Sequence, residues 1–242
     1  IENGACNRIL NNYDKTQRMI DNILFIWGDS SQKFKDGTAA KDDLNKYYLD
    51  ILHGNIDLET ITNNKLKGFY NLGSNNFDLV SCQFSIHYFF KDLETLNGLL
   101  ENVSRLLKPG GVFIGTSLDG KNVFDILKKN QAIMEHEEDT LLWKINKKYK
   151  DNQFNDDETC LGYSIDVYME SIGKTFTEYL VNYTYLESLL QQYNLKLKEL
   201  YSFTDMYIEL NKSEEVYGNA LNMSDKLKTY SFLNKCFVIE KI

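Results

Sequence analysis

The spacing of apolar residues changes twice between residues 77 and 116, and these changes predict a strand, a helix and a second strand. Phe77, Leu79 and Val80 form a short apolar run that indicates a buried strand. Between residues 92 and 107 the apolar side chains recur every three or four residues, as in an amphipathic helix, at Leu93, Leu96, Leu100, Val103 and Leu107. Residues 108–111, Lys-Pro-Gly-Gly, end this helix because proline cannot continue it. Residues 112–116 are again apolar and predict the second strand.

A strand, a helix and a strand in this order predict a right-handed βαβ unit with parallel strands. Polar and aromatic side chains interrupt the apolar pattern where the first strand should end, at Gln83, His87 and Tyr88. Ligands of parallel sheets bind at the carboxyl ends of the strands. These three side chains are therefore candidate site residues.

The rest of the chain predicts a mixture of helices and strands. Helical spacing is found in residues 4–22, 44–52, 58–66, 123–133, 185–193 and 205–211. Strands are predicted for residues 22–27, 141–145, 161–167, 176–181, 195–203 and 235–240. Residues 35–76 are interpreted as an insertion or long connection, and residues 213–229 as polar and loosely ordered. We therefore expect one α/β domain over residues 1–242, with residues 140–182 as a small inserted β region.

Composition narrows the possible functions. The chain has 242 residues, of which 43% are hydrophobic and 26% charged, as in ordinary globular proteins. There is no run of eighteen apolar residues that would predict a membrane span. The formal net charge of −8 argues against binding of long nucleic acid through its phosphates. A pocket for a single nucleotide is still possible, because it needs only a few local charges. The cysteines contain no Cys-x-x-Cys pair, which argues against a zinc site or disulfide framework and favours a reducing compartment.

Three residues carry candidate chemistry, and each has a plainer alternative. Asp29 follows an apolar run and a glycine and could bind a ligand's amine or hydroxyl, but such an Asp also commonly caps a helix or turn. His87 could be a base, a metal ligand or a hydrogen-bonding group, and the alternative is a packed core side chain. A metal is set aside because His53 and His136 lack ligand spacing to it. Glu178 interrupts a strand-like segment, where it is either buried with a partner or solvated on an edge strand.

Several segments together resemble the messenger-RNA cap (guanine-N7) methyltransferases. The densest match is in residues 77–90, where Cys-Gln-Phe is followed two residues later by His-Tyr. Residues 106–116, Leu-Leu-Lys-Pro-Gly-Gly-Val-Phe-Ile-Gly-Thr, are similar to a motif shared by all class I methyltransferases. Residues 26–31 resemble the adenine-proximal segment of the family, and residues 177–181 resemble its guanine-binding segment, which carries a glutamate.

The resemblance implies a class I, Rossmann-like sheet that binds S-adenosylmethionine and transfers its methyl group to N7 of the cap guanine. It assigns Asp29, Ser30, Gln83, Phe84 and Tyr88 to the cofactor, and His87, Tyr88 and Glu178 to the guanine, with residues 140–182 as the cap-binding insertion. No general base is expected, because N7 carries no proton. The implied partner is 5′-capped RNA, with other capping-enzyme domains or an activating subunit as further candidates. The alternatives are a small-molecule methyltransferase of the same class, and an inactive methyltransferase-like subunit of a capping complex.

Two departures from the family pattern shape these expectations. The glycine-rich loop after the family's first strand and the acidic residue that ends its second strand are absent from these residues. We therefore expect the chain to be a fragment of a longer polypeptide, inactive by itself. The aromatic residue of the family's last strand falls at Asn234, so its role is not carried over. The amino-acid sequences of residues 85–88 and 117–120 resemble those of capping enzymes of large DNA viruses. The expected location is intracellular: the nucleus for a cellular protein, the cytoplasm or virion for a viral one.

Overall fold

The computed structural model describes residues 22–212 and 222–242. The predicted helix over residues 4–22 lies almost entirely outside the described residues. The chain divides into two compact units, Ile1–Ser74 and Asn75–Ile242, and each is described by itself. Among the described residues, no helix combines the length and apolar character needed to cross a bilayer.

The first unit is built from short helices: α2 (Asp43–Leu52), η1 (Leu58–Thr60) and α3 (Asn64–Lys67). The helix predicted for residues 44–52 is confirmed as α2, but its buried apolar residues are Leu49 and Ile51, whereas Leu44 is 57% exposed. The helix predicted for residues 58–66 is instead two short ones, because the Asn63 side chain caps a new helix by accepting from Lys65 N. The strand predicted for residues 22–27 is wrong. This stretch has no strand to pair with in the described part of the unit, where an isolated bridge joins Gly28 to Ala40.

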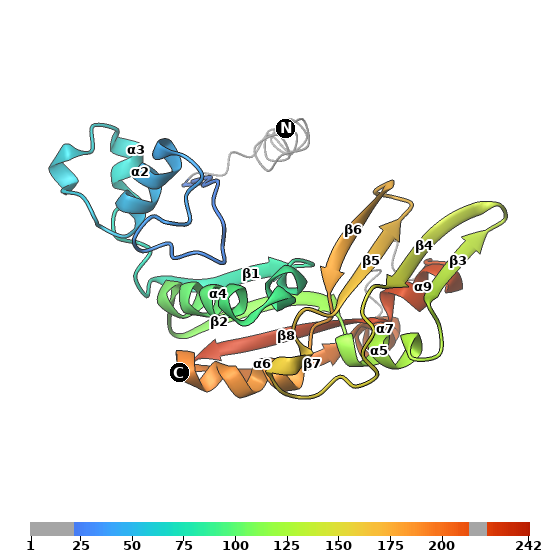
Figure 1. Ribbon diagram of the computed structural model, residues 1–242. Coiled ribbons are helices and arrows are strands. Elements are labelled where there is room, and N and C mark those ends of the chain that lie inside the picture. The colour runs from blue at the N-terminus through green and yellow to red at the C-terminus, as the bar shows by residue number, and fades with distance from the viewer. Residues whose placement is uncertain (1–21, 213–221) are drawn as a thin grey trace. The chain divides into compact units, whose positions relative to one another are not determined.

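The second unit contains a four-stranded sheet in the order β1-β2-β8-β7 (Figure 1). Its strands are β1 (Phe77–Gln83), β2 (Leu107–Leu118), β7 (Leu195–Ser202) and β8 (Asn234–Lys241). The predicted βαβ unit is confirmed, since β1 and β2 are parallel, whereas β8 is antiparallel to both of its neighbours. Residues 108–111 belong to β2 and not to a separating loop. A register shift between Phe77 and Leu79 accommodates them.

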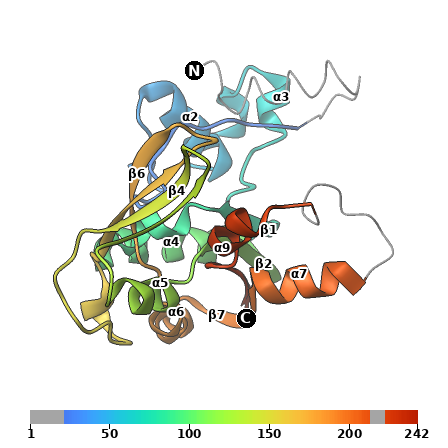
Figure 2. The ribbon, with the colours of Figure 1, turned by 90° about the vertical axis from the view of Figure 1, so that its right-hand side faces the viewer.

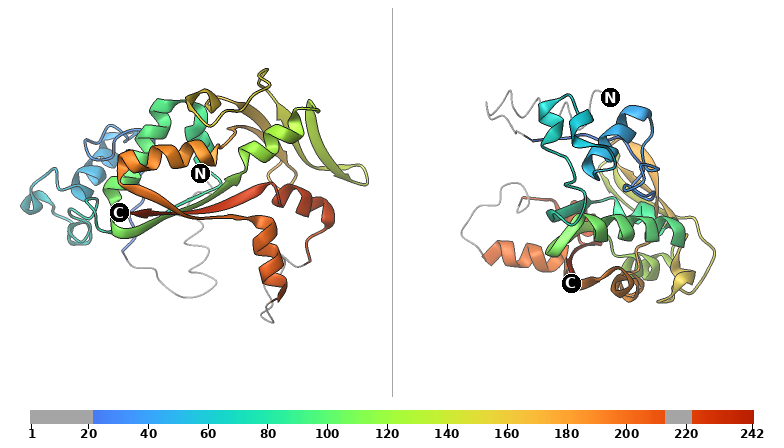
Figure 3. Two further views of the ribbon diagram at one scale, coloured as in Figure 1. Left: turned by 90° about the horizontal axis from the view of Figure 1, so that it is seen from below. Right: turned by 90° about the vertical axis from the view of Figure 1, so that its left-hand side faces the viewer.

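Helices pack on one face of this sheet: α4 (Leu93–Leu106), α5 (Gly120–Leu127) and α6 (Tyr183–Leu190). The helix α7 (Phe203–Lys212) follows β7 and extends away from the other side of the sheet (Figures 2 and 3). The helix α4 begins at Asp92, whose carboxylate accepts from Thr95 N. Its buried residues Leu96, Leu100 and Val103 belong to the same core as Phe113 and Phe237 of the sheet. The chain leaves α6 through η4 (Gln191–Tyr193) and Asn194, whose φ of 53° ends the helix as predicted.

A second, fully antiparallel sheet projects from the end of the first sheet at which β1 ends (Figure 1). It consists of β3 (Ala132–Glu137), β4 (Thr140–Lys147), β5 (Ser164–Met169) and β6 (Lys174–Tyr179), with η3 (Glu158–Cys160) between β4 and β5. The inserted β region is therefore confirmed, but it begins at Ala132 and not at residue 140. The helix predicted for residues 123–133 ends at Leu127, because residues from Ala132 onward belong to the strand β3. A short apolar run such as Ala132–Met134 suits either a helix or a strand, and pairing with β4 decides for the strand.

The last part of the chain differs from its prediction in one element. The predicted strands at 195–203 and 235–240 and the helix at 205–211 are confirmed as β7, β8 and α7. Residues 225–229, expected to be loosely ordered, belong to α9 (Asp225–Ser231), and residues 213–221 lie outside the described part. Packing stabilises this helix, because the Trp143 indole of β4 donates to Lys226 O and packs at a tilt against the Tyr230 ring. That contact comes from a distant part of the chain, so local polarity could not reveal it.

Candidate functional site

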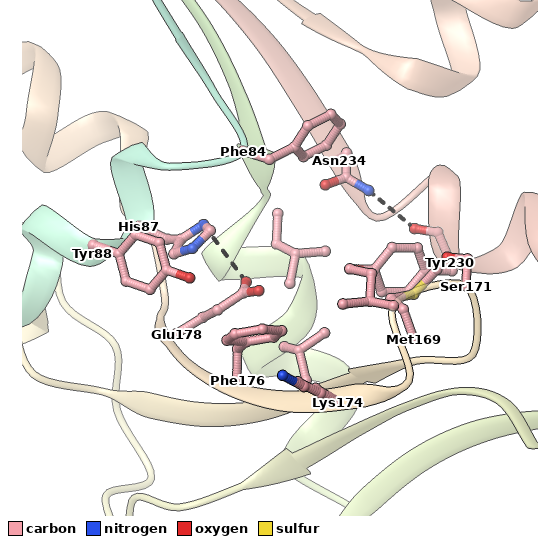
Figure 4. Close-up of a pocket in the computed structure, with 13 residues that line it drawn as sticks. Phe84, His87, Tyr88, Met169, Ser171, Lys174, Phe176, Glu178, Tyr230 and Asn234 are labelled. Carbon is pink, nitrogen blue, oxygen red and sulfur yellow. Dashed lines mark hydrogen bonds and ion pairs between the residues drawn. The ribbon is translucent and has the colours of Figure 1, made fainter. Parts of the chain in front are cut away.

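A cavity of about 440 Å³ opens between the carboxyl end of β1 and the face of the β5–β6 hairpin (Figure 4). Its lining combines aromatic and aliphatic side chains with a few polar groups: Phe84, His87, Tyr88, Leu118, Val167, Met169, Ser171, Ile172, Lys174, Phe176, Glu178, Tyr230 and Asn234. Apolar walls with a small number of converging polar groups are typical of small-ligand sites.

The backbone at the end of β1 turns three side chains into this cavity. Phe84 has a φ of 48°, which is left-handed and uncommon for a residue with a β-carbon. Its N–H donates to Thr116 O at 3.0 Å and to Thr116 Oγ1 at 3.1 Å, which holds the turn in place. The chain then enters η2 (Ile86–Lys91), so that His87 and Tyr88 follow Phe84 into the lining.

The opposite wall comes from β6. Side chains alternate along a strand, and Lys174, Phe176 and Glu178 all point to the cavity. The Glu178 side chain is 16% exposed, so it is not the solvated edge-strand residue of the plainer alternative. The elements that supply His87 and Glu178 thus converge from distant parts of the sequence, and the assignment of this pair to the guanine stays a prediction.

Burial determines the electrostatics of this pair. His87 Nδ1 lies 3.6 Å from Glu178 Oε2. Burial raises the pKa of Glu178 to about 7 and lowers the pKa of His87 to about 4, since both charged forms lose water. Near pH 7 the imidazole is therefore neutral and the carboxyl group is close to half ionised. His87 Nε2 is buried and has no hydrogen-bond partner among the described residues. A buried polar atom of this kind is costly unless a ligand satisfies it.

Tyr88 completes this side of the cavity. Its ring packs edge-on to His87 at a centroid distance of 4.2 Å, and 46% of the residue remains exposed. Partial burial raises the pKa of its phenol, and the nearby Glu178 carboxylate raises it further. An exposed ring that leans on a buried imidazole can cover a planar ligand.

Comparison with known proteins identifies the family. The family model of the mRNA (guanine-N(7))-methyltransferase domain matches residues 28–234. The chain belongs to this family. The mixed sheet, with parallel β1 and β2 and antiparallel β8, agrees with the predicted class I methyltransferase fold.

Individual relatives agree with this assignment. A protein of Acanthamoeba polyphaga mimivirus described as a probable mRNA-capping enzyme is 31% identical over 92% of this chain and 18% of its own length. The mRNA cap guanine-N(7) methyltransferase of Candida albicans is 32% identical over 60% of this chain and 31% of its own length. The chain therefore spans less than half of these relatives. A methyltransferase structure from Clostridium acetobutylicum, S-adenosylmethionine-dependent, covers 98% of this chain at 14% identity with a TM-score of 0.40. At that score it adds no argument to the family match.

The predicted cofactor residues of this cap methyltransferase domain lie in different places. Phe84 and Tyr88 line the cavity together with His87 and Glu178. Gln83 is exposed just before it, where Gln83 Oε1 accepts from Thr116 Oγ1 at 3.0 Å and Gln83 Nε2 donates to Ser81 Oγ at 3.1 Å. A primary amide has two N–H donors, so one remains for a ligand, and the assignment of Gln83 to S-adenosylmethionine stays a prediction.

Asp29 and Ser30 belong to the first unit, and their assignment to the cofactor stays a prediction. The Asp29 carboxylate accepts from Ser31 N at 3.0 Å and from Ser31 Oγ at 2.7 Å, and it pairs with Lys41 at 3.3 Å. These bonds lower the pKa of Asp29. They are the bonds expected of the turn-forming alternative.

Sequence reasoning missed nine of the side chains that line the cavity, among them Lys174, Phe176, Tyr230 and Asn234. Strand alternation from Glu178 would have found Phe176 and Lys174, since they lie two and four residues before it. Tyr230 gave no signal because its helix was not predicted. Within residues 22–212 and 222–242, no cluster of three or more His, Cys, Asp or Glu side chains could hold a metal ion.

Proposed function

We propose that this domain transfers a methyl group from S-adenosylmethionine to N7 of the guanine that caps messenger RNA. The observation that carries the proposal is the Glu178 carboxyl group in a cavity with Phe84, His87 and Tyr88. The family match supports the reaction class, and the cavity supports a planar, hydrogen-bonding acceptor.

The polar groups suit the Watson–Crick edge of guanine. An ionised carboxylate only accepts hydrogen bonds, and guanine offers two neighbouring donors, N1–H and the N2 amine. Neutral His87 has one N–H, for which guanine O6 is an acceptor. Adenine offers a donor and an acceptor instead, so it would leave Glu178 incompletely satisfied. A site whose buried polar groups are left unpaired rejects the wrong ligand strongly.

The reaction itself asks little acid–base chemistry of the protein. S-adenosylmethionine supplies an electrophilic methyl group on a sulfonium. Guanine N7 is a lone pair without a proton, so no residue has to act as a general base. Rate enhancement then comes from alignment of the guanine and exclusion of water by Phe84 and Tyr88. Glu178 adds an electrostatic contribution, because its negative charge stabilises the positive charge that develops on the purine.

The substrate class follows from the same site, and the larger assembly from the relatives. A cap-binding cavity implies 5′-capped RNA, and the mimivirus relative is a much longer capping enzyme. The net charge of −8 suggests that RNA beyond the cap is held by other parts of the polypeptide or by a partner subunit.

A methyl-transfer assay with the full-length protein tests this proposal. Labelled S-adenosylmethionine is supplied with RNA that begins in GpppA or, as the control, in ApppA. We expect label only on the GpppA RNA, recovered as 7-methylguanosine after digestion. Transfer to both RNAs, or to a small acceptor in preference to either, would favour the small-molecule alternative. Binding of GpppA without transfer would favour the inactive subunit.

A further inference from the structure

One face of β6 presents three kinds of side chain in a row. Glu178 lies at the inner end of the strand, Phe176 in the middle, and Lys174 at the outer end, where the hairpin turns. Their partners on β5 are Ile165, Val167 and Met169, which fix the register of the hairpin. Thr177 lies on the opposite face of the strand, where its Oγ1 donates to Asp166 Oδ1 at 2.9 Å.

The Lys174 ammonium is available for a ligand. Lys174 is exposed, and it is the single Lys or Arg among the described residues that line the cavity. No hydrogen bond or ion pair to a described residue engages its ammonium. Lys148, by contrast, is engaged with Asp166 of β5 at 3.2 Å. A free cation at the mouth of a cavity is notable in a chain of net charge −8.

The geometry points to Lys174 as a phosphate subsite, which binds the triphosphate bridge of the cap while Glu178 binds its guanine. This inference rests on the proposed function. A cap carries its negative charge directly beyond the ribose of the guanosine, and a lysine ammonium is a flexible point charge for phosphate. Phe176, which is 41% exposed, lies between the two charged groups, next to the expected place of the ribose.

The spacing along β6 suits such a ligand. Four residues of a strand span about 13 Å at roughly 3.3 Å per residue. The lysine side chain then covers part of this distance, because it is long and can bend back over Phe176. A guanosine nucleotide has comparable length from its Watson–Crick edge to its first phosphates. Side chains of one strand can thus contact the ligand from its base to its phosphates. Free guanosine has no phosphate, so it can contact only the inner half of the strand.

Binding measurements on the full-length protein test the inference. The ligands are guanosine, GTP and GpppA, and the variants are Lys174→Ala, Lys174→Arg and the control Lys129→Ala. Lys129 is also exposed, so its replacement changes the net charge equally but lies outside the cavity. We expect Lys174→Ala to weaken GpppA about three- to tenfold, the range for one partly exposed charge-assisted contact, and to leave guanosine unchanged. Lys174→Arg should restore GpppA binding, and the salt dependence should be shallower only for Lys174→Ala.

The outcomes separate this inference from the proposed function. Equal losses for guanosine and GpppA, or no loss for either, would overturn the phosphate subsite while leaving guanine recognition in place. If Lys174→Ala weakened GTP binding more than GpppA binding, the subsite would belong to a free nucleotide and the cap assignment would be overturned. If the unmodified protein bound guanosine no better than adenosine, the proposed function would fail whatever Lys174 does. Thermal unfolding of each variant confirms that the hairpin is intact.

Discussion

His87 Nδ1 lies 3.6 Å from Glu178 Oε2, and burial moves the pKa values of the two groups in opposite directions, to about 4 and about 7. Near neutral pH the contact is therefore between a neutral imidazole and a carboxyl group close to half ionisation. A bound ligand with hydrogen-bond donors would replace the water that Glu178 loses on burial and would favour its ionised form.

Guanosine binding should depend on the ionisation of Glu178. Only the ionised carboxylate can accept from both N1–H and the N2 amine, so affinity should rise with pH up to about 7 and then level off. Below that pH we expect a loss of about tenfold per pH unit. Titration calorimetry at pH 6 in two buffers of different ionisation enthalpy should show release of a proton on binding.

The matched control for the pH effect is Glu178→Gln, which keeps the shape of the side chain and removes its ionisation. This variant should bind guanosine about tenfold or more weakly at pH 7, because the amide places a donor against a donor. Its remaining affinity should not change between pH 5.5 and 7.5. A pH-independent affinity in the unmodified protein would show that Glu178 does not contact the guanine.

The same pair makes opposing contributions to the stability of the ligand-free protein. The raised pKa of Glu178 gives stability that is fully present below about pH 4.5 and is lost as pH rises to about 7. The lowered pKa of His87 gives stability that is present above about pH 6.5 and is lost as pH falls to about 4. Each slope is at most about 1.4 kcal/mol per pH unit, so the two nearly cancel between pH 4.5 and 6.5.

Single replacements should reveal the two opposing pH dependences of the free energy of unfolding, which cancel in the unmodified protein. Relative to the unmodified protein, the free energy of unfolding of Glu178→Gln should increase as pH rises from 4.5 to 7. That of His87→Asn should decrease as pH rises from 4 to 6.5. Urea unfolding of both variants and the double variant, at several pH values, measures these differences. Parallel pH profiles for all four proteins would contradict the assigned pKa shifts.

Local patterns were sufficient for the central part of the fold. The helix from Leu93 to Leu106 has a long 3.6-residue period, a capping Asp92 and an obvious end, so its location needed no tertiary information. The edge strand β7 alternates apolar and polar residues, and Asn194 marks the turn before it. Gln83, His87 and Tyr88 stood out because polar groups interrupted a buried strand where ligands usually bind.

Pairing and packing between distant segments determined what the sequence could not show. Residues 132–134 form a strand because β4 pairs with them, and α9 is held by Trp143 from another part of the chain. The cavity depends on the same long-range contacts, so Tyr230 and Asn234 could not be assigned to it from their neighbours in sequence. Lys174 and Phe176, in contrast, share the face of Glu178 by simple strand alternation, and the register of β5 and β6 agrees with it.

Phe84 should combine a backbone cost with a ligand contact. Its φ of 48° disfavours any residue with a β-carbon, and its ring is 53% exposed in the cavity and packs edge-on to Phe203. Phe84→Gly removes both the cost and the ring, whereas Phe84→Ala removes only the ring. We expect equal losses of guanosine affinity, with the glycine variant about 1 kcal/mol more stable than the alanine variant. Equal stability of the two variants would mean that the turn carries no strain.

Asn234 should act on the site through Tyr230. Its buried amide donates to Tyr230 O at 3.2 Å and to Ser231 O at 3.1 Å, the last carbonyls of α9. Tyr230 O also accepts from Leu233 N, so Asn234→Ala leaves mainly Ser231 O unsatisfied and should cost about 1–2 kcal/mol of stability.

The same replacement should loosen the Tyr230 ring, which lines the cavity and packs 5.5 Å from Trp143. We therefore expect Asn234→Ala to weaken guanosine binding severalfold and to speed hydrogen exchange in α9. Tyr230→Phe keeps the ring and should bind as the unmodified protein does, whereas Tyr230→Ala should bind more weakly than Asn234→Ala. If Tyr230→Ala bound guanosine normally, the ring would only close the core around Trp143. Any effect of Asn234 on affinity would then have to come from its own side chain.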